Sequence, residues 1–179
     1  MSVKTLMTDE ELMQLPDDGH KYEYVDGEVK VSPAGLIHER LGLRLGRKLD
    51  EFTEKHQLGG VYGSSAGYRM KSGNVLSPDI SFIRKSRLHG GKSPKGFGHF
   101  APDLAVEILS PSDRLADLQG KIKEYFENGS EQVWILDPWE KRTFVYHLAA
   151  DYEVFDEHED ITGGDLLPSF SFRLGDLLE

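Results

Sequence analysis

The sequence predicts a mixed α/β or α+β fold, in which helices flank a mixed central sheet. Two observations favour this class. Short apolar or alternating runs of strand length recur from residue 22 to residue 148, and two longer segments with helical periodicity interrupt them. Neither an internal repeat nor a linker divides the chain. We therefore expect one domain over residues 1–179, which is long enough to bury a core.

The first elements are predicted by local signals. Thr8 and Glu11 have the spacing of a capping box, which predicts a short helix running to about Leu15. Two alternating runs, 22–25 and 28–31, flank an Asp-Gly pair and predict a β-hairpin with a two-residue turn.

The long helix is expected over about 36–57, because leucines and a phenylalanine recur there at helical spacing. Gly42 and Gly46 interrupt it, and each costs about 1 kcal/mol relative to alanine in a helix interior. Their spacing of four lets something approach the backbone closely, and we expect that to be the sheet. Gly59-Gly60 is expected to end the helix.

Strands and a second helix should complete the chain. A strand over 61–71 is expected to pair with 76–83 across a turn at 72–74, and 104–109 is a further strand. Ser112 or Asp113 is expected to cap a helix that ends at Gly129. Further strands are expected over 133–136, over 143–148 and near Glu153, followed by an ordered end at 170–174.

The composition excludes several classes of protein. The absence of cysteine excludes disulfides, thiolate catalysis and zinc–thiolate sites. No apolar run approaches the roughly 20 residues of a membrane span, and residues 1–9 lack the apolar core of a signal peptide. We therefore expect a cytoplasmic protein without a membrane partner. The net charge of −10 argues against non-specific coating of nucleic acid, since phosphate contacts need a basic surface.

The charge is unevenly distributed. Residues 151–179 contain nine acids and one cation, Arg173, whereas the segment between Asp79 and Asp103 contains no acid. The cations of that segment are Arg84, Lys85, Arg87, Lys92 and Lys95. Glycines and a proline make residues 84–101 a loop. It could follow a DNA backbone, with Phe97 and Phe100 available for stacking, or it could be a mobile surface loop.

Two isolated carboxylates mark the candidate site. Asp79 and Glu107 each lie within a run that otherwise has the composition of a buried strand. A buried charge is costly unless it is compensated, and a metal ion is one such compensator. Mg²⁺ is commonly held by one or two carboxylates together with substrate phosphate. The other interpretations are a turn or cap residue for Asp79 and a structural ion pair for Glu107.

A phosphodiester reaction also needs a cation that stabilises the transition state. Lys121 is the best candidate, because it lies at the edge of the apolar stripe, four residues from Asp117 and from Tyr125. Lys123 ranks second because it points more toward solvent. A solvated surface lysine is the other interpretation of Lys121, and Asp117 is interpreted as a first-turn acid that favours the helix dipole.

An ordered set of motifs over residues 8–178 resembles the Uma-two family of "putative restriction endonucleases", within the PD-(D/E)xK nucleases. The matching positions are Tyr22-Glu23, Asp26-Gly27, His38, Ser77-Pro78-Asp79, Pro102-Asp103-Leu104, 106–112, Asp117, Lys121, Tyr125, Gly129, Glu131, Trp134 and Leu136-Asp137-Pro138. The resemblance implies a restriction-endonuclease-like αβββαβ core preceded by the hairpin. It also implies Mg²⁺- or Mn²⁺-dependent cleavage of DNA, and we expect a homodimer that can cut both strands.

The resemblance further implies that Asp79 and Glu107 bind the metal, and that Lys121 joins them as a catalytic residue. In the PD-(D/E)xK motif the lysine lies two residues after the second acid, and Leu109 occupies that position here. The resemblance therefore implies that Lys121, from the following helix, replaces the motif lysine. Glu23 is a candidate third acidic ligand or a strand-surface residue. His38 either assists at the site or is a helix-start histidine.

Two alternatives to a nuclease remain. A non-catalytic nucleic-acid-binding or regulatory protein that retains the fold is favoured by the acidic composition and by Leu109. Hydrolysis of a glycoside by the carboxylate pair is weakened, because no aromatic platform accompanies either acid in the sequence.

Overall fold

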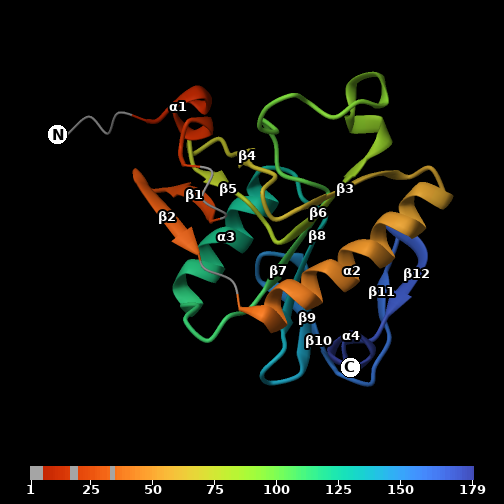
Figure 1. The fold of residues 1–179 in the computed structure, drawn as a ribbon. Coiled ribbons are helices and arrows are strands. Elements are labelled where there is room, and N and C mark those ends of the chain that lie inside the picture. Colours follow the sequence, from red (N-terminus) through yellow and green to blue (C-terminus); the bar gives the residue numbers. More distant parts are fainter. Residues whose placement is uncertain (1–5, 17–19, 33–34) are drawn as a thin grey trace.

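The computed structural model describes residues 6–16, 20–32 and 35–179. The first five residues, part of the segment inspected for a signal peptide, lie outside this description. The fold is the mixed α+β arrangement predicted from the sequence. A six-stranded sheet is covered on one face by α2 (Leu36–Lys55) and on the other by α3 (Leu115–Glu127), as Figure 1 shows.

The six-stranded sheet has the order β10-β9-β8-β7-β6-β3. Its strands are β3 (Gly59–Gly63), β6 (Ile80–Arg84), β7 (Leu104–Ile108), β8 (Gln132–Asp137), β9 (Arg142–Leu148) and β10 (Asp151–Asp156). All neighbours are antiparallel except β7 and β8, which are parallel and joined by α3. The sheet is therefore mixed, as predicted. Parallel neighbours need a crossover connection, and α3 is that connection between β7 and β8.

β7 is buried on both faces, and its alternation decides where Glu107 points. Leu104, Val106 and Ile108 pack in the core under α2, whereas Ala105 packs in the core under α3. Successive side chains of a strand point to opposite faces. Glu107 therefore lies on the α3 face of the sheet, in the same layer as Tyr125.

A second sheet, ordered β2-β1-β5-β4, carries the N-terminal hairpin. Its strands are β1 (Lys21–Val25), β2 (Glu28–Ser32), β5 (Val75–Leu76) and β4 (Tyr68–Arg69). Asp26 and Gly27 have φ values of 55° and 89°, as a two-residue hairpin turn requires. The predicted hairpin is thereby confirmed. The capping box of α1 (Asp9–Met13) is confirmed as well, with Thr8 and Glu11 bonded reciprocally.

The single strand predicted over 61–71 is wrong. The chain bends at residues 64–67, so that β3 pairs with β6 in one sheet and β4 pairs with β5 in the other. The run predicted as 76–83 is divided in the same way. Ser77-Pro78-Asp79 is the connection between the two sheets, and this places Asp79 where they meet.

Two predicted helix boundaries are also wrong. α2 ends at Lys55, and Gln57 takes the left-handed conformation with φ 54°, whereas Gly59 and Gly60 belong to β3. A Cβ at Gly59 would lie 1.9 Å from the carbonyl oxygen of Ile83, so strand packing explains that glycine.

α3 has Arg114 as its N-cap, without a side-chain hydrogen bond, because the Asp113 carboxylate accepts from the Ser110 N–H instead. Gly129 ends the helix with φ 104°, as predicted.

The acidic C-terminal region covers the α2 side of the core. It forms β11 (Ile161–Gly163), β12 (Leu167–Phe172) and α4 (Leu174–Leu178). Phe170 stacks on Trp134, with ring centroids 6.2 Å apart, and confirms the predicted ordered end. Between β6 and β7 the loop contains two short 3₁₀ turns, Lys85–Arg87 and His89–Gly91. None of the helices in the described ranges is long and apolar enough to cross a membrane.

Candidate active site

Asp79 and Glu107 come together at the junction of the two sheets. Ile80 of β6 pairs with Val106 of β7, and the same register continued by one residue sets Asp79 beside Glu107. The Asp79 Oδ2 accepts the Ile108 N–H at 2.7 Å. The two residues are 7% and 5% exposed. The register thus sets the two acids next to each other, with Asp79 in contact with His38 of α2 and Glu107 in contact with Tyr125 of α3. A shared face for the two carboxylates stays a prediction.

Asp79 is held by two cationic groups. Lys21 Nζ lies 2.8 Å from Oδ1, and His38 Nε2 lies 3.0 Å from Oδ2. Burial opposes ionisation of the carboxyl, but the His38 hydrogen bond and the Lys21 charge hold the pKa of Asp79 well below its usual range. Asp79 is therefore a carboxylate at neutral pH.

Glu107 contacts the α3 layer. Its Oε1 accepts a hydrogen bond from the Tyr125 hydroxyl at 2.7 Å and lies 3.4 Å from Lys121 Nζ. Burial raises the pKa of the Glu107 carboxyl, against the opposing charges of Lys121 and Lys21. Tyr125 thus has a double role, because its ring packs in the core and its hydroxyl fixes the orientation of Glu107.

Lys121 lies between two acids. Its Nζ is 2.8 Å from Glu23 Oε2, in addition to its contact with Glu107. Burial opposes its charge, but Glu107 and Glu23 outweigh burial and raise the pKa of Lys121. The alternative of a solvated surface lysine is therefore wrong for Lys121. Lys123 does point to solvent, where it pairs with Glu127 at 3.7 Å.

Glu23 is a buried member of the cluster rather than a strand-surface residue. It is 4% exposed, and its Oε1 accepts the Ser77 N–H at 2.8 Å. One carboxylate thus joins β1, the connection that carries Asp79, and Lys121. The hairpin is consequently part of the site.

Lys21 is the residue that the sequence interpretation missed. It is buried beside Asp79, and burial, which would lower its pKa, is outweighed by the charges of Glu107 and Asp79, which raise it. Lys21 and Glu23 are two apart on β1 and so share a face. Because Glu23 is a candidate site residue, the alternation of side chains along this strand indicates that Lys21 lies on the same face. This is the signal in the sequence that could have found Lys21.

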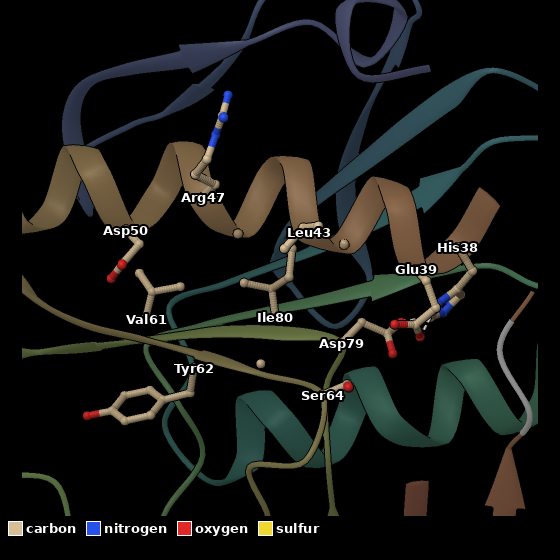
Figure 2. Close-up of a pocket in the computed structure, with 13 residues that line it drawn as sticks. His38, Glu39, Leu43, Arg47, Asp50, Val61, Tyr62, Ser64, Asp79 and Ile80 are labelled. Atoms are coloured by element: carbon tan, nitrogen blue, oxygen red, sulfur yellow. Dashed lines mark hydrogen bonds and ion pairs between the residues drawn. The ribbon is translucent and has the colours of Figure 1, made fainter. Parts of the chain in front are cut away.

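His38 lies in the first turn of α2 and points toward Asp79, as Figure 2 shows. Burial disfavours its charged form, but the Asp79 hydrogen bond and charge raise the pKa of His38. Its Nδ1 lies 3.7 Å from Glu39 Oε1. The contact with Asp79 places His38 at the cluster.

Asp117 lies apart from the cluster. It is a surface residue of the first turn of α3, and its Oδ1 lies 3.5 Å from Lys30 Nζ. The prediction of a first-turn acid fits this position.

The cations of the basic segment 84–101 are of two kinds, arginines in ion pairs and exposed lysines. Arg84 forms an ion pair with Glu131, and Arg87 pairs with Asp103 at 3.0 Å while its guanidinium lies 4.6 Å above the Phe100 ring. Those two arginines therefore have structural partners. Lys85, Lys92 and Lys95 are exposed. Phe97 is half-buried against Gly67, so that neither phenylalanine presents a free ring.

The cluster offers carboxylate oxygens, which are the ligands that a magnesium ion prefers. Among residues 6–16, 20–32 and 35–179, no group of three or more acidic, histidine or cysteine side chains is close enough to form a metal cluster. Mg²⁺ needs fewer, because one or two carboxylates suffice alongside water and phosphate oxygens. Asp79 and Glu107 supply such hard oxygen ligands, so the residues fit this ion, with the Lys21 ammonium as a competitor for Asp79.

Comparisons with known proteins agree with this fold. A crystal structure described as "a putative nuclease belonging to DUF820", from Anabaena variabilis ATCC 29413, is 22% identical. It superposes with a TM-score of 0.83 over 96% of this chain and 97% of that one. This likeness shows the restriction-endonuclease-like fold. A search of curated proteins gives no match. The model of the Uma2 family, described as "Putative restriction endonuclease", matches residues 9–175, so the chain belongs to that family.

Proposed function

We propose that this protein is a Mg²⁺-dependent endonuclease that hydrolyses phosphodiester bonds of DNA. The observation that carries the proposal is the position of Asp79, directly before β6, beside Glu107 of β7, with the Lys121 ammonium 3.4 Å from Glu107. Membership of the Uma2 family supports a nuclease function. We further propose that residues 1–179 form one domain and that the protein meets DNA in the cytoplasm.

Asp79 and Glu107 would hold the Mg²⁺, or Mn²⁺ in its place. The ion supplies an acidified water and stabilises charge on a phosphate oxygen. Lys121 contributes a second positive charge at the reacting phosphate, which is the role of the lysine in a phosphodiester hydrolase. Glu23 and Tyr125 keep Lys121 and Glu107 in place through contacts of 2.8 Å and 2.7 Å. Lys121 thereby supplies the positive charge that Leu109, at the position of the motif lysine, cannot supply.

Lys21 and His38 have a positioning role in this proposal. Both contact Asp79 from outside the α3 layer, at 2.8 Å and 3.0 Å. They balance the acidic cluster when no divalent ion is present, which keeps the buried carboxylates from repelling one another. Lys85, Lys92 and Lys95 are the exposed cations available for contacts with DNA phosphates.

A homodimer would allow both strands of a duplex to be cut. An aromatic and apolar surface on β9 and β10 supports it, because Phe144, Tyr146, Tyr152 and Val154 share one face at the edge of the sheet. Tyr152 and Val154 are 49% and 46% exposed. Val154→Arg should convert a dimer into a monomer in light scattering, whereas Glu153→Arg, on the opposite face, should leave the mass unchanged.

A non-catalytic DNA-binding or regulatory protein is the second candidate. The observation that favours it is the Lys21–Asp79 pair, because the buried acids are neutralised without any metal. Calorimetric titration of Mn²⁺ into the wild-type protein separates the two. One saturable site that Asp79→Asn removes, with conversion of supercoiled plasmid in Mg²⁺, supports the nuclease. The absence of both metal binding and cleavage supports the second candidate.

A further inference from the structure

A cavity of about 450 Å³ lies between α2 and β3, the edge strand of the large sheet, and it reaches the candidate active site. Figure 2 shows α2 on one side of it, Val61 and Ile80 on the other, and Asp79 with His38 at one end. A molecule in this cavity would lie directly beside Asp79, one of the two acids proposed to hold the metal.

Two glycines of α2, Gly42 and Gly46, belong to the lining of the cavity. A Cβ at Gly42 would lie 3.5 Å from Ile108 Cδ1, and one at Gly46 would lie 4.0 Å from Ile80 Cγ1. Both are ordinary contact distances, so helix–sheet packing accepts alanine at either position. The neighbours of the two glycines are sheet residues, as expected, but neither contact is close enough to require glycine. Each glycine still costs about 1 kcal/mol of helix stability, and both line the cavity.

The cavity wall suits a flat, uncharged group with N–H donors. Val61, Ile80 and the two glycines make it mainly apolar. Asp50 and Ser64 add acceptors, and in Figure 2 Asp50 points from α2 toward the sheet. The Asp50 carboxylate repels phosphate at the far end of the cavity. The proposed metal would lie at the Asp79 end, which is therefore the end that favours phosphate.

We propose that this cavity receives the base of an unpaired nucleotide next to the scissile phosphate. The substrate class is then single-stranded or locally unpaired DNA, because a base inside a duplex is stacked and cannot enter a side cavity unless it is extruded. The volume is within the roughly 300–1,000 Å³ of small-molecule sites. The inference rests on the nuclease function proposed above and specifies its substrate.

The basic segment is attached to the same edge strand but on its other face. The Ser93 hydroxyl lies 2.8 Å from that of Tyr62, whose ring packs on the α3 face of the sheet and points away from the cavity in Figure 2. The exposed Lys92 and Lys95 of this loop are therefore available to phosphates that pass around the edge of the sheet at β3.

Fluorescence anisotropy with two labelled eight-residue strands tests the proposal. One strand is oligothymidylate and the other consists of abasic residues with the same charge, and both are titrated with protein in Ca²⁺. The wild type should bind the strand with bases at least tenfold more tightly. Gly46→Leu, which fills the cavity, should abolish the difference, whereas Gly46→Ala should keep it. Thermal unfolding verifies that each variant is folded, and Ser64→Leu fills the cavity from the sheet if Gly46→Leu is unfolded.

Equal binding of the two strands by the wild type would overturn the inference, as would discrimination that persists in a folded, cavity-filled variant. Its failure is distinct from failure of the proposed function. A protein that cleaves DNA but does not discriminate keeps the nuclease function and loses the base site. A protein that discriminates but cleaves neither single strands nor duplexes keeps the base site and loses the nuclease function.

Discussion

The ammonium nitrogen of Lys121 lies 2.8 Å from Glu23 Oε2, and this contact joins the helix after β7 to the N-terminal hairpin. Glu23 also accepts the Ser77 N–H, two residues before Asp79. The hairpin therefore sets the position of the lysine and of the segment that carries the first acid. A lysine from a helix needs such support, because its long side chain has many rotamers that burial must restrict.

Glu23→Gln tests that support. The neutral amide weakens the hold on Lys121, so cleavage should fall about 10- to 100-fold, as for other groups that orient a metal-site residue. Adding Lys121→Met to Glu23→Gln should cost less than the sum of the two single losses, because the residues act as a unit. Plasmid nicking rates give all four values. Additive losses, or an equal loss in the exposed control Glu28→Gln, would refute the coupling.

Lys21→Met tests the competition for Asp79. Removal of an ammonium that lies 2.8 Å from Oδ1 frees a carboxylate oxygen and adds net negative charge at the site. Mn²⁺ should therefore bind about tenfold more tightly, which corresponds to about 1.4 kcal/mol. Calorimetry measures this without reference to activity. Lys30→Met, at the surface of β2, is the matched control, and unchanged affinity in Lys21→Met would show that Lys21 does not compete.

Tyr125→Phe tests the hydrogen bond to Glu107. The substitution preserves the ring in the core but removes the donor at 2.7 Å from a buried acceptor. The free energy of unfolding should fall by about 1–3 kcal/mol, the cost of a buried polar group left without its partner. Urea denaturation measures the difference. Tyr146→Phe, half-buried on β9, should change stability much less, and similar losses in both variants would contradict the assignment.

The pH dependence of stability tests the His38–Asp79 pair. Asp79 raises the pKa of His38 above its ordinary value of 6.5 in the folded state. The charged pair therefore contributes fully below pH 6.5 and is lost as pH rises through the folded pKa. The stability difference between wild type and His38→Gln should be larger at pH 5.5 than at pH 9. His158→Gln, at an exposed histidine, should show no such trend, and a difference that grows with pH would have the wrong sign.

Much of the fold could be predicted because its central elements have strong patterns. The leucine stripe of α2 and the apolar runs of β7 and β8 depend on burial alone, which the sequence displays directly. The division of 61–71 and 76–83 between two sheets could not be predicted. Alternation within a run does not reveal which neighbour a strand pairs with, and the bend at 64–67 has no proline to mark it.

The site was predictable where a charge conflicts with its surroundings. Asp79 and Glu107 are conspicuous because a carboxylate in an apolar strand needs a partner. Lys21 is not, because a lysine at the start of a hairpin strand has the composition of an exposed residue. Alternation along β1 puts Lys21 on the same face as Glu23, but the contact with Asp79 arises from the packing of β1 against β5, which the local pattern does not encode.

Cleavage of supercoiled plasmid is the most direct test of the metal site formed by Asp79 and Glu107. Wild type, Asp79→Asn, Glu107→Gln and the exposed control Asp117→Asn are compared in Mg²⁺, with chelator added to parallel samples. We predict cleavage by wild type and Asp117→Asn, its loss on chelation, and none by Asp79→Asn or Glu107→Gln. Undiminished cleavage by either carboxylate variant, or by the wild type in chelator, would contradict the account.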